Sequence, residues 1–241
     1  MEGLRHVPIL ILGGGISGMG AAQKASEQGR EFLVLEAAST LGGTLRSLEI
    51  HGHTLDIGAN SCASSEDFEQ FLSHIGLEDK ILKANSLSKK RYLFHDKKVV
   101  SVGGLRDIIG ASWLSLMGKL RIGIEPFRKR GNVEDESVAS FLSRRIGWEA
   151  TEKLVEPVLG GIYGGDIHYL SAATILKKFK VGEQQNGSML RTLLKDPPMP
   201  RKIISVEGGF AKIGEAFTQK HTDQVLLETK VQKIEKISSG F

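Results

Sequence analysis

Hydrophobic positions in the N-terminal part of the chain follow the order strand, helix, strand. The apolar run Ile9–Leu12 leads directly into a turn of three glycines. Small residues recur at helical spacing between Ser17 and Gln28, and a second apolar run, Phe32–Leu35, ends at Glu36. A short apolar run bounded by glycine is typical of a buried strand, and a 3.6-residue period is typical of a helix. The pattern therefore predicts a βαβ unit.

Helical spacing dominates the middle of the chain. Apolar residues recur every three or four positions in residues 64–76, 105–127, 137–147 and 148–159, and each segment predicts a helix. The glycine cluster from 160 to 165 predicts the end of the last of these helices. Residues 91–102 alternate around Asp96 and Lys97, which predicts a β-hairpin.

Strand and helix patterns alternate again after residue 200. A strand is expected at 202–206, then a helix, and then two β-like runs at 225–228 and 231–237. The order predicts an α/β fold in which a mostly helical segment interrupts a dinucleotide-binding domain. The predicted division is 1–85 for the first part of that domain, 86–200 for the inserted helical region, which is expected to bind the substrate, and 201–241 for the second part.

The glycines after the first strand have the spacing of a dinucleotide-binding turn. Gly13, Gly15 and Gly18 stand in the G-x-G-x-x-G register, and Glu36 follows 36 − 13 = 23 positions after the first glycine. In this register the glycines permit the turn, the approach of a pyrophosphate and close helix packing, and the acid accepts ribose hydroxyls. The alternative is an ordinary glycine-rich turn. The predicted site residues are Gly13, Gly15, Ile16, Ser17, Gly18, Glu36 and Ala37.

Composition narrows the class of protein. Glycine makes up 29 of 241 residues, which is above the usual share of about 7% and indicates close backbone approach to a ligand. The net charge of +4 favours an anionic substrate or membrane surface, but basic and acidic residues are mixed, so no nucleic-acid partner is expected. The lone Cys62 and the lack of a long apolar run predict a cytoplasmic protein. Residues 105–127 mix apolar and basic positions, which fits either a core-packed helix or a surface that touches a membrane peripherally.

Several motifs together resemble the flavin amine oxidase superfamily. They are Gly13-Gly14-Gly15-Ile16-Ser17-Gly18, Glu36, Gly42-Gly43-x-x-Arg46 and Asp56-x-Gly58-Ala59-Asn60-Ser61. Within that superfamily, Gly161-Ile162-Tyr163-Gly164-Gly165-Asp166 followed by Leu170-Ser171 resembles the protoporphyrinogen oxidase family. The similarity covers nearly the whole chain. Members of the family continue well beyond this length, so the resemblance is to their N-terminal portion, and we expect the C-terminal part of the family fold to be missing here.

The resemblance implies FAD, rather than NAD, as the cofactor. It implies that Gly42 and Gly43 pass close to the FAD and that Arg46 faces the pyrophosphate or the flavin. A surface salt bridge is the alternative for Arg46. It also implies that Gly58, Ala59 and Asn60 lie beside the isoalloxazine, where the alternative is a plain turn.

The reaction implied is the oxidation of protoporphyrinogen IX to protoporphyrin IX, with oxygen as acceptor and the flavin carrying the chemistry. By resemblance, Arg91 contacts a propionate of the tetrapyrrole and Gly161 turns its carbonyl to the pyrrole N–H groups. Neither a catalytic side chain nor a metal is expected. The alternatives are coproporphyrinogen III as substrate, another FAD amine oxidase-type enzyme, and an N-terminal fragment without activity. A homodimer is a further expectation.

Overall fold

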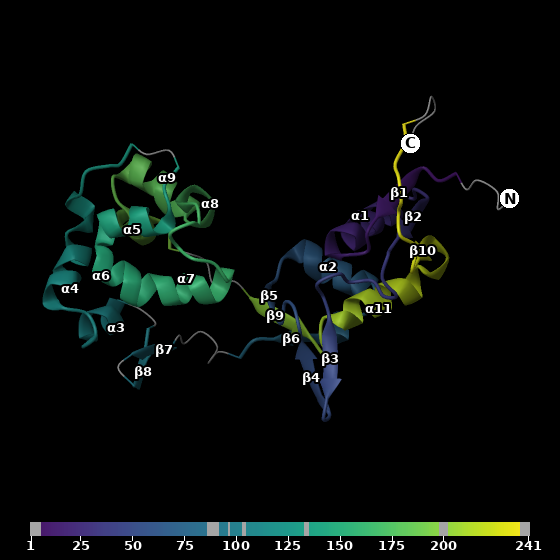
Figure 1. Cartoon of the computed structure of the whole chain (residues 1–241), viewed down its shortest axis with the longest axis horizontal. Helices are drawn as coiled ribbons and strands as arrows, with labels where there is room; N and C mark the ends of the chain where they lie inside the picture. The colour runs from purple at the N-terminus through teal and green to yellow at the C-terminus, as the bar shows by residue number, and fades with distance from the viewer. Residues whose placement is uncertain are drawn as a thin grey trace. The chain divides into compact units, whose positions relative to one another are not determined.

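A computed structural model describes residues 6–85, 92–95, 97–102, 105–132, 135–197 and 202–236 (Figure 1). The chain divides into two compact units. We call Met1–Ala84 together with Arg201–Phe241 the split unit, and Asn85–Pro200 the helical unit.

A parallel sheet forms the centre of the split unit. Strand β1 (Ile9–Leu12) pairs with β2 (Phe32–Leu35), and β2 pairs on its other side with β10 (Val225–Leu226). Helix α1 (Ile16–Glu27) connects β1 to β2, as a parallel pair requires a crossover. The predicted βαβ unit is confirmed.

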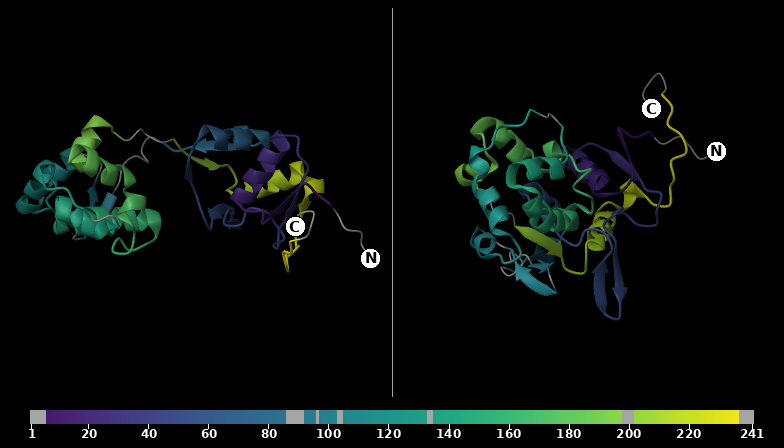
Figure 2. Two further views of the ribbon diagram at one scale, coloured as in Figure 1. Left: turned by 90° about the horizontal axis from the view of Figure 1, so that it is seen from above. Right: turned by 60° about the vertical axis from the view of Figure 1, so that its left-hand side comes forward.

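Two antiparallel structures extend this unit. The hairpin of β3 (Ser47–Ile50) and β4 (His53–Asp56) projects from the rest of the unit (Figures 1 and 2). Its two turn residues, His51 and Gly52, both have positive φ, which matches the twist of the strands. In a second sheet β9 (Ile203–Val206) lies between two short strands. The remaining elements are β5 (Cys62–Ala63), α2 (Glu66–His74), η1 (Glu78–Lys80), β6 (Ile81–Lys83), α11 (Ala211–Lys220) and η5 (Thr222–Gln224).

The core of the split unit lies between its helices and sheets. Met19 of α1, Leu72 of α2 and Phe217 of α11 are fully buried together with side chains of β2 and β9. Residues 231–236 form no strand, so the predicted strand 231–237 is wrong over that range, and Ile237 lies outside the described residues. The reason is that an alternating run becomes a strand only where another strand pairs with it.

The described residues of the helical unit form mostly short helices and a hairpin. None of the helices in the described residues is long and apolar enough to cross a membrane. The hairpin predicted at 91–102 is formed by β7 (Tyr92–His95) and β8 (Lys98–Ser101). The segment 105–127, predicted as one helix, is instead divided into α3 (Leu105–Gly110), α4 (Leu116–Gly123) and η3 (Glu125–Phe127). The remaining helices, apart from the long one described next, are α5 (Val138–Ile146), α8 (Ala172–Ile175), α9 (Lys177–Asn186) and α10 (Met189–Lys195).

One longer helix runs through this unit in three parts. It begins with α6 (Trp148–Ala150), continues as the π-helical turn η4 (Thr151–Val155), and ends as α7 (Glu156–Tyr163). The glycine cluster was predicted to end the helix at residue 159, but it continues for four residues more. It ends where Gly164 adopts a left-handed conformation with φ 60°.

The core of the helical unit contains charged side chains beside its apolar ones. Arg145 and Glu125 are fully buried, and Arg145 Nε donates to Glu125 Oε1 at 2.7 Å. Arg145 Nη1 also lies 3.3 Å from Glu183 Oε1, and Glu183 accepts from Arg144 as well. Glu125 in turn accepts from the Met189 N–H at the start of α10. The network therefore joins η3, α5, α9 and α10.

Candidate dinucleotide site

The first turn of the split unit has the backbone that a dinucleotide-binding turn requires. Gly13 has φ 98°, and a Cβ at Gly18 would overlap the carbonyl oxygen of Gly13. Both positions therefore need glycine for the turn itself. A Cβ at Gly15 would meet nothing within 4 Å, so the space beside Gly15 is open. An open approach at this position is what a pyrophosphate needs.

The N-terminus of α1 faces this opening. Gly15 is its N-cap residue and provides no capping side chain, and the first turn carries no acid. The N–H groups of the first turn, including those of Ile16 and Ser17, therefore have no partner within the helix. Unpaired N–H groups and the positive end of the helix dipole favour an anionic group here.

A second glycine segment lies directly beside the first. The Gly42 N–H donates to the Gly14 carbonyl oxygen at 2.8 Å, and Gly15 and Gly42 form a parallel bridge. A Cβ at Gly43 would lie 3.3 Å from the Gly15 Cα, and Gly43 has φ 60°. The two segments thus present a continuous strip of bare backbone. The structure brings these predicted site residues together.

The acid at the end of β2 also reaches the turn. Glu36 Oε1 accepts from the Ala38 N–H at 2.8 Å, and its Oε2 accepts from the Gly14 N–H at 2.7 Å. These two backbone donors, with a smaller contribution from Ala37, lower the pKa of Glu36 below its usual range. The carboxylate is therefore charged at neutral pH. Each oxygen keeps a further lone pair, which a ribose hydroxyl can use.

Residues near the end of the chain complete the surroundings of Glu36. The Glu36 N–H donates to the Leu226 carbonyl oxygen at 2.9 Å, and the Thr229 N–H donates to the Glu36 carbonyl oxygen at 2.8 Å. The sequence predicted a strand at 225–228, of which only Val225 and Leu226 form β10, and it did not predict that Leu226 and Thr229 lie beside Glu36. The only available signal was that β-rich run, because pairing between distant strands leaves no local pattern.

Arg46 lines a cavity that none of the glycines of this strip lines, and the motif after β4 packs on Thr44, just past the strip. The cavity has a volume of about 560 Å³ and lies between residues 39–48 and α11. A Cβ at Gly58 would overlap the Thr44 carbonyl oxygen, so chain packing already requires that glycine. Ala59 and Asn60 are exposed in the turn that follows. The roles expected for these four residues toward FAD stay predictions.

The motif's aspartate holds a helix in place. Asp56 Oδ1 accepts from the Ser47 hydroxyl at 2.6 Å and from the Phe210 N–H at 2.9 Å, and the Ser47 oxygen accepts from the Ala211 N–H at 3.0 Å. Helix α11 begins at Ala211 with no capping side chain of its own. Asp56 and Ser47 therefore supply its N-terminal cap from the β3–β4 hairpin.

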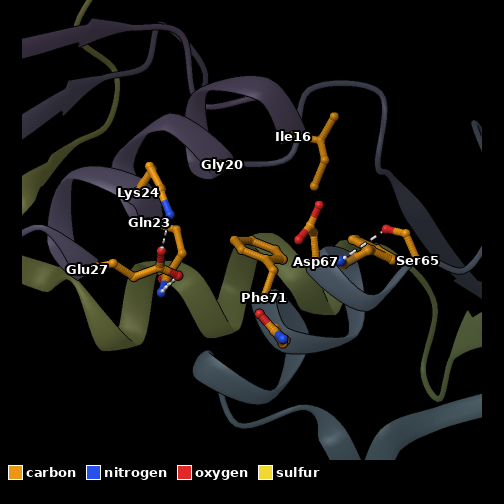
Figure 3. A pocket seen from close by; sticks show the side chains of 10 residues that line it. Ile16, Gly20, Gln23, Lys24, Glu27, Ser65, Asp67 and Phe71 are labelled. Atoms are coloured by element: carbon orange, nitrogen blue, oxygen red, sulfur yellow. Dashed lines mark hydrogen bonds and ion pairs between the residues drawn. The ribbon is translucent and has the colours of Figure 1, made fainter.

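A groove lies between α1 and α2 (Figure 3). It has a volume of about 470 Å³, and the side chain of Ile16 lies in it together with Gly20, Asp67 and Phe71. Ile16 is one of the predicted cofactor residues. In the structure its backbone adjoins the glycine turn, and its side chain lies in this groove.

The two predicted substrate residues belong to the helical unit. Gly161 is exposed in the last turn of α7, and a Cβ there would meet nothing within 4 Å. Its carbonyl is one of the last four of the helix, which have no intrahelical donor. Arg91 lies outside the described residues. Among the described residues, no group of three His, Cys, Asp or Glu side chains is placed to hold a metal ion.

Comparison with known proteins identifies the family to which this chain belongs. The model of the family described as flavin containing amine oxidoreductase matches residues 16–241. The chain is 28% identical to protoporphyrinogen oxidase 1, chloroplastic, of Spinacia oleracea, over 96% of this chain and 45% of that protein. It is also 28% identical to coproporphyrinogen III oxidase of Staphylococcus aureus, over 76% of this chain and 42% of that protein.

Solved structures show the same fold. A crystal structure of an Exiguobacterium sp. 255-15 protein named as a protoporphyrinogen oxidase superposes with a TM-score of 0.76 at 23% identity, over 98% of this chain and 55% of that one. Reduced UDP-galactopyranose mutase gives a TM-score of 0.66 at 17% identity, over 96% and 50%. The chain spans about half the length of the curated relatives it matches. It belongs to the flavin containing amine oxidoreductase family, whose cofactor is FAD.

Proposed function

We propose that this chain holds the dinucleotide part of FAD in an oxidoreductase that acts on a porphyrinogen. The observation that carries the proposal is the strip of bare backbone at Gly13–Gly15 and Gly42–Gly43, with the charged Glu36 at its edge. The N-terminus of α1 would bind the pyrophosphate, and Glu36 would accept the ribose hydroxyls. FAD, when bound, accepts the hydride equivalents removed from the substrate.

Two features of the turn support FAD as its ligand. A nucleotide needs open space beside the second glycine of the turn, and the space beside Gly15 is open. It also needs an acid at the end of β2, and Glu36 is ionised there. A 2′-phosphate beside this carboxylate would be repelled, so a dinucleotide with a free ribose hydroxyl is favoured.

Substrate choice rests on the relatives and on the helical unit. Relatives named protoporphyrinogen oxidase and coproporphyrinogen III oxidase match at the same identity, so both porphyrinogens are candidate substrates. Gly161 supports a flat substrate that donates N–H groups, because the space where its Cβ would stand is open and its carbonyl belongs to the last turn of α7. Oxygen as the final acceptor is part of the same proposal. A homodimer and a cytoplasmic location stay predictions, and light scattering tests the first of them.

The first experiment asks whether the purified chain retains FAD. Visible absorption after desalting measures bound flavin, and quenching of flavin fluorescence measures the affinity of added FAD. We expect Gly15→Ala to weaken FAD binding by about tenfold or more, because its methyl group occupies the open space of the turn. Gly20→Ala is the matched control, since a Cβ there also meets nothing within 4 Å but lies in the groove with α2.

Two outcomes would overturn the proposal. Failure to bind FAD at any concentration would favour the alternative of an N-terminal fragment without activity. Equal affinities for FAD in Gly15→Ala and Gly20→Ala would place the flavin elsewhere.

If FAD binds, oxidation of protoporphyrinogen IX and coproporphyrinogen III is compared by porphyrin fluorescence and oxygen uptake. Gly161→Ala should then lower kcat/KM while FAD affinity is unchanged, with Gly160→Ala as its neighbour control.

A further inference from the structure

The hydrogen-bond ladder between β10 and β2 is interrupted just after β10, beside the acid of the dinucleotide site. The two strands are parallel, and Leu226 lies opposite Leu35 (Figure 1). The Leu226 carbonyl oxygen accepts from the Glu36 N–H at 2.9 Å. In a regular parallel ladder every second residue faces the same neighbour, so the Glu228 N–H would be the next to donate to this segment, at the Glu36 carbonyl oxygen.

The chain instead contains one extra residue at this point. The Thr229 N–H, and not that of Glu228, donates to the Glu36 carbonyl oxygen at 2.8 Å. The Glu228 N–H donates to the Ala38 carbonyl oxygen at 2.9 Å. Two successive N–H groups therefore point to the same neighbouring segment. An extended strand cannot do this, because its successive N–H groups point to opposite sides.

The backbone of Glu228 makes this arrangement possible. Its φ is 53°, in the left-handed region, which residues other than glycine seldom adopt. The side chain of Glu228 is exposed, so burial of that side chain does not account for the conformation. One left-handed residue that adds a position to a strand is the arrangement of a bulge, and strained positions persist where the surrounding contacts over-determine them. Here those contacts are the two bonds to residues 36 and 38.

The two bonds hold the segment that carries the acid. Ala38 is bound at both of its backbone groups, because its carbonyl oxygen accepts from Glu228 and its N–H donates to Glu36 Oε1 at 2.8 Å. Glu36 is also bound at both its N–H and its carbonyl oxygen. Its other carboxylate oxygen, Oε2, accepts from the Gly14 N–H. The direction of the Glu36 carboxylate therefore depends on the position of residues 36–38, and that position depends on the turn at Glu228.

We propose that Glu228 is a positioning residue for the recognition of ribose. Its left-handed backbone holds residues 36–38 so that the Glu36 carboxylate faces the ribose hydroxyls of a bound dinucleotide. The inference rests on the proposed function, because that function assigns the ribose to Glu36. It goes further by naming a residue outside the glycine turn that acts through Glu36 and sets the preference for ribose over deoxyribose.

The test compares two nucleotides that differ by one hydroxyl. Isothermal titration calorimetry measures the affinity of the full chain for ADP, for 2′-deoxy-ADP, and for inorganic pyrophosphate, which has no ribose. We expect the parent chain to bind ADP about tenfold more tightly than 2′-deoxy-ADP, because a hydrogen bond to a charged group is lost with the hydroxyl. This affinity ratio reports on the Glu36 carboxylate. A general loss of stability would weaken the binding of both nucleotides and leave the ratio unchanged.

Substitutions at residue 228 separate its backbone from its side chain. Glu228→Val should reduce the affinity ratio to about twofold or less, because a β-branched residue opposes a positive φ, while the affinity for pyrophosphate stays the same. Glu228→Gly should keep the parent ratio, because glycine adopts this conformation freely. Lys230→Val is the matched control, since Lys230 is also exposed but its φ is not positive, and it should keep the parent ratio too.

Two further measurements support the comparison of the variants. Hydrogen exchange at the Ala38 amide should rise in Glu228→Val and stay unchanged in Glu228→Gly and Lys230→Val, because only the first variant disturbs the segment that holds Ala38. Circular dichroism establishes that each variant is folded. Glu228→Thr, which is β-branched but polar, takes the place of Glu228→Val if the latter does not fold, and the same decrease in the ratio is expected.

The other outcomes distinguish this inference from the proposed function. An unchanged ratio in Glu228→Val, with ADP still bound, would overturn the inference and leave the proposed function standing. Equal decreases in Glu228→Val and Glu228→Gly would assign the effect to the Glu228 carboxylate rather than to its backbone, and would also overturn the inference. A parent ratio near one would remove the recognition of ribose by Glu36 and, with it, this role of Glu228. A parent chain that binds neither ADP nor FAD would overturn both proposals.

Discussion

The split unit and the helical unit place their polar groups differently. In the split unit, the glycine turn leaves backbone N–H groups and the open space beside Gly15 facing outward, while its core is built from apolar side chains. In the helical unit, Arg145, Glu125 and Glu183 lie fully buried and satisfy one another. Polar groups that pair internally stabilise their own unit. Polar groups left open at a turn are placed to bind something from outside it.

The largest expected effect comes from breaking the buried network. Arg145→Met leaves Glu125 and Glu183 buried without this guanidinium, and we expect the helical unit to lose about 3–5 kcal/mol. Urea unfolding followed by tryptophan fluorescence measures this loss, because both tryptophans, Trp113 and Trp148, belong to the helical unit. Hydrogen exchange of α1 reports on the split unit and should be unchanged.

The exposed Arg191 provides the control for Arg145. Arg191→Met removes only a ring contact with Phe127, so it should change stability by less than about 0.5 kcal/mol. If Arg145→Met cost no more than Arg191→Met, the buried network would not be what stabilises the helical unit.

A second prediction concerns two glycines of α1 that are two residues apart. Gly18→Ala places a methyl group on the carbonyl oxygen of Gly13 and should destabilise the split unit by about 1–3 kcal/mol. Gly20→Ala meets open space within a helix and should stabilise it by about 0.5–1 kcal/mol. Hydrogen exchange of the α1 amides measures both. Changes of the same sign in the two variants would contradict this account of the turn.

The third prediction removes the cap that the hairpin supplies to α11. Asp56→Ala loses the bonds from the Ser47 hydroxyl and the Phe210 N–H, so the split unit should lose about 1–2 kcal/mol. Within the split unit, hydrogen exchange should rise most at the backbone amides in the first turn of α11. Asp67→Ala, an exposed acid in the first turn of α2, is the control and should cost less. An equal loss in both variants would exclude a specific capping role.

The sequence predicted those parts of the fold that depend on local pattern. The turn at Gly13–Gly18 and the acid at Glu36 followed from spacing, because a dinucleotide turn fixes both within one βαβ unit. The family assignment followed from the same motifs and is confirmed by the family model. Helix ends were predicted less well: the glycines at 160–161 were expected to break a helix that in fact continues to Tyr163. Glycine weakens a helix interior by only about 1 kcal/mol, which packing overrides.

Contacts between distant segments could not be predicted. Asp56 looked like part of a cofactor motif, yet its carboxylate caps a helix 154 positions further along the chain. Glu36 is bound by residues 226 and 229, and Arg145 by Glu125 of η3, Glu183 of α9 and the Gly187 carbonyl oxygen just after α9. Each of these depends on which elements pack together, and that is decided by the whole fold rather than by any short pattern.

The smallest expected effect is a pH dependence confined to the helical unit. Glu149 accepts from the Ser115 hydroxyl at 2.5 Å and from the Ser115 N–H at 2.9 Å, and Lys153 lies 3.1 Å away. These partners, the Ser115 hydroxyl first, lower the pKa of Glu149 from 4.5 to about 2. Because the folded pKa lies below the unfolded one, the ionised Glu149 stabilises the unit above about pH 4.5. That stability is lost as the pH falls toward about 2.

Glu149→Gln isolates this contribution from those of Glu136 and Glu183, whose pKa values are also lowered. The difference in unfolding free energy between the parent chain and Glu149→Gln should be present at pH 7 and should shrink as the pH approaches 2. Urea unfolding followed by tryptophan fluorescence measures this difference. Hydrogen exchange of the α1 amides reports on the split unit and should not show the same pH dependence. A difference that stays constant from pH 7 to pH 2 would mean that the Ser115 contacts hold the neutral side chain equally well, and that charge has no part in joining α4 to α6.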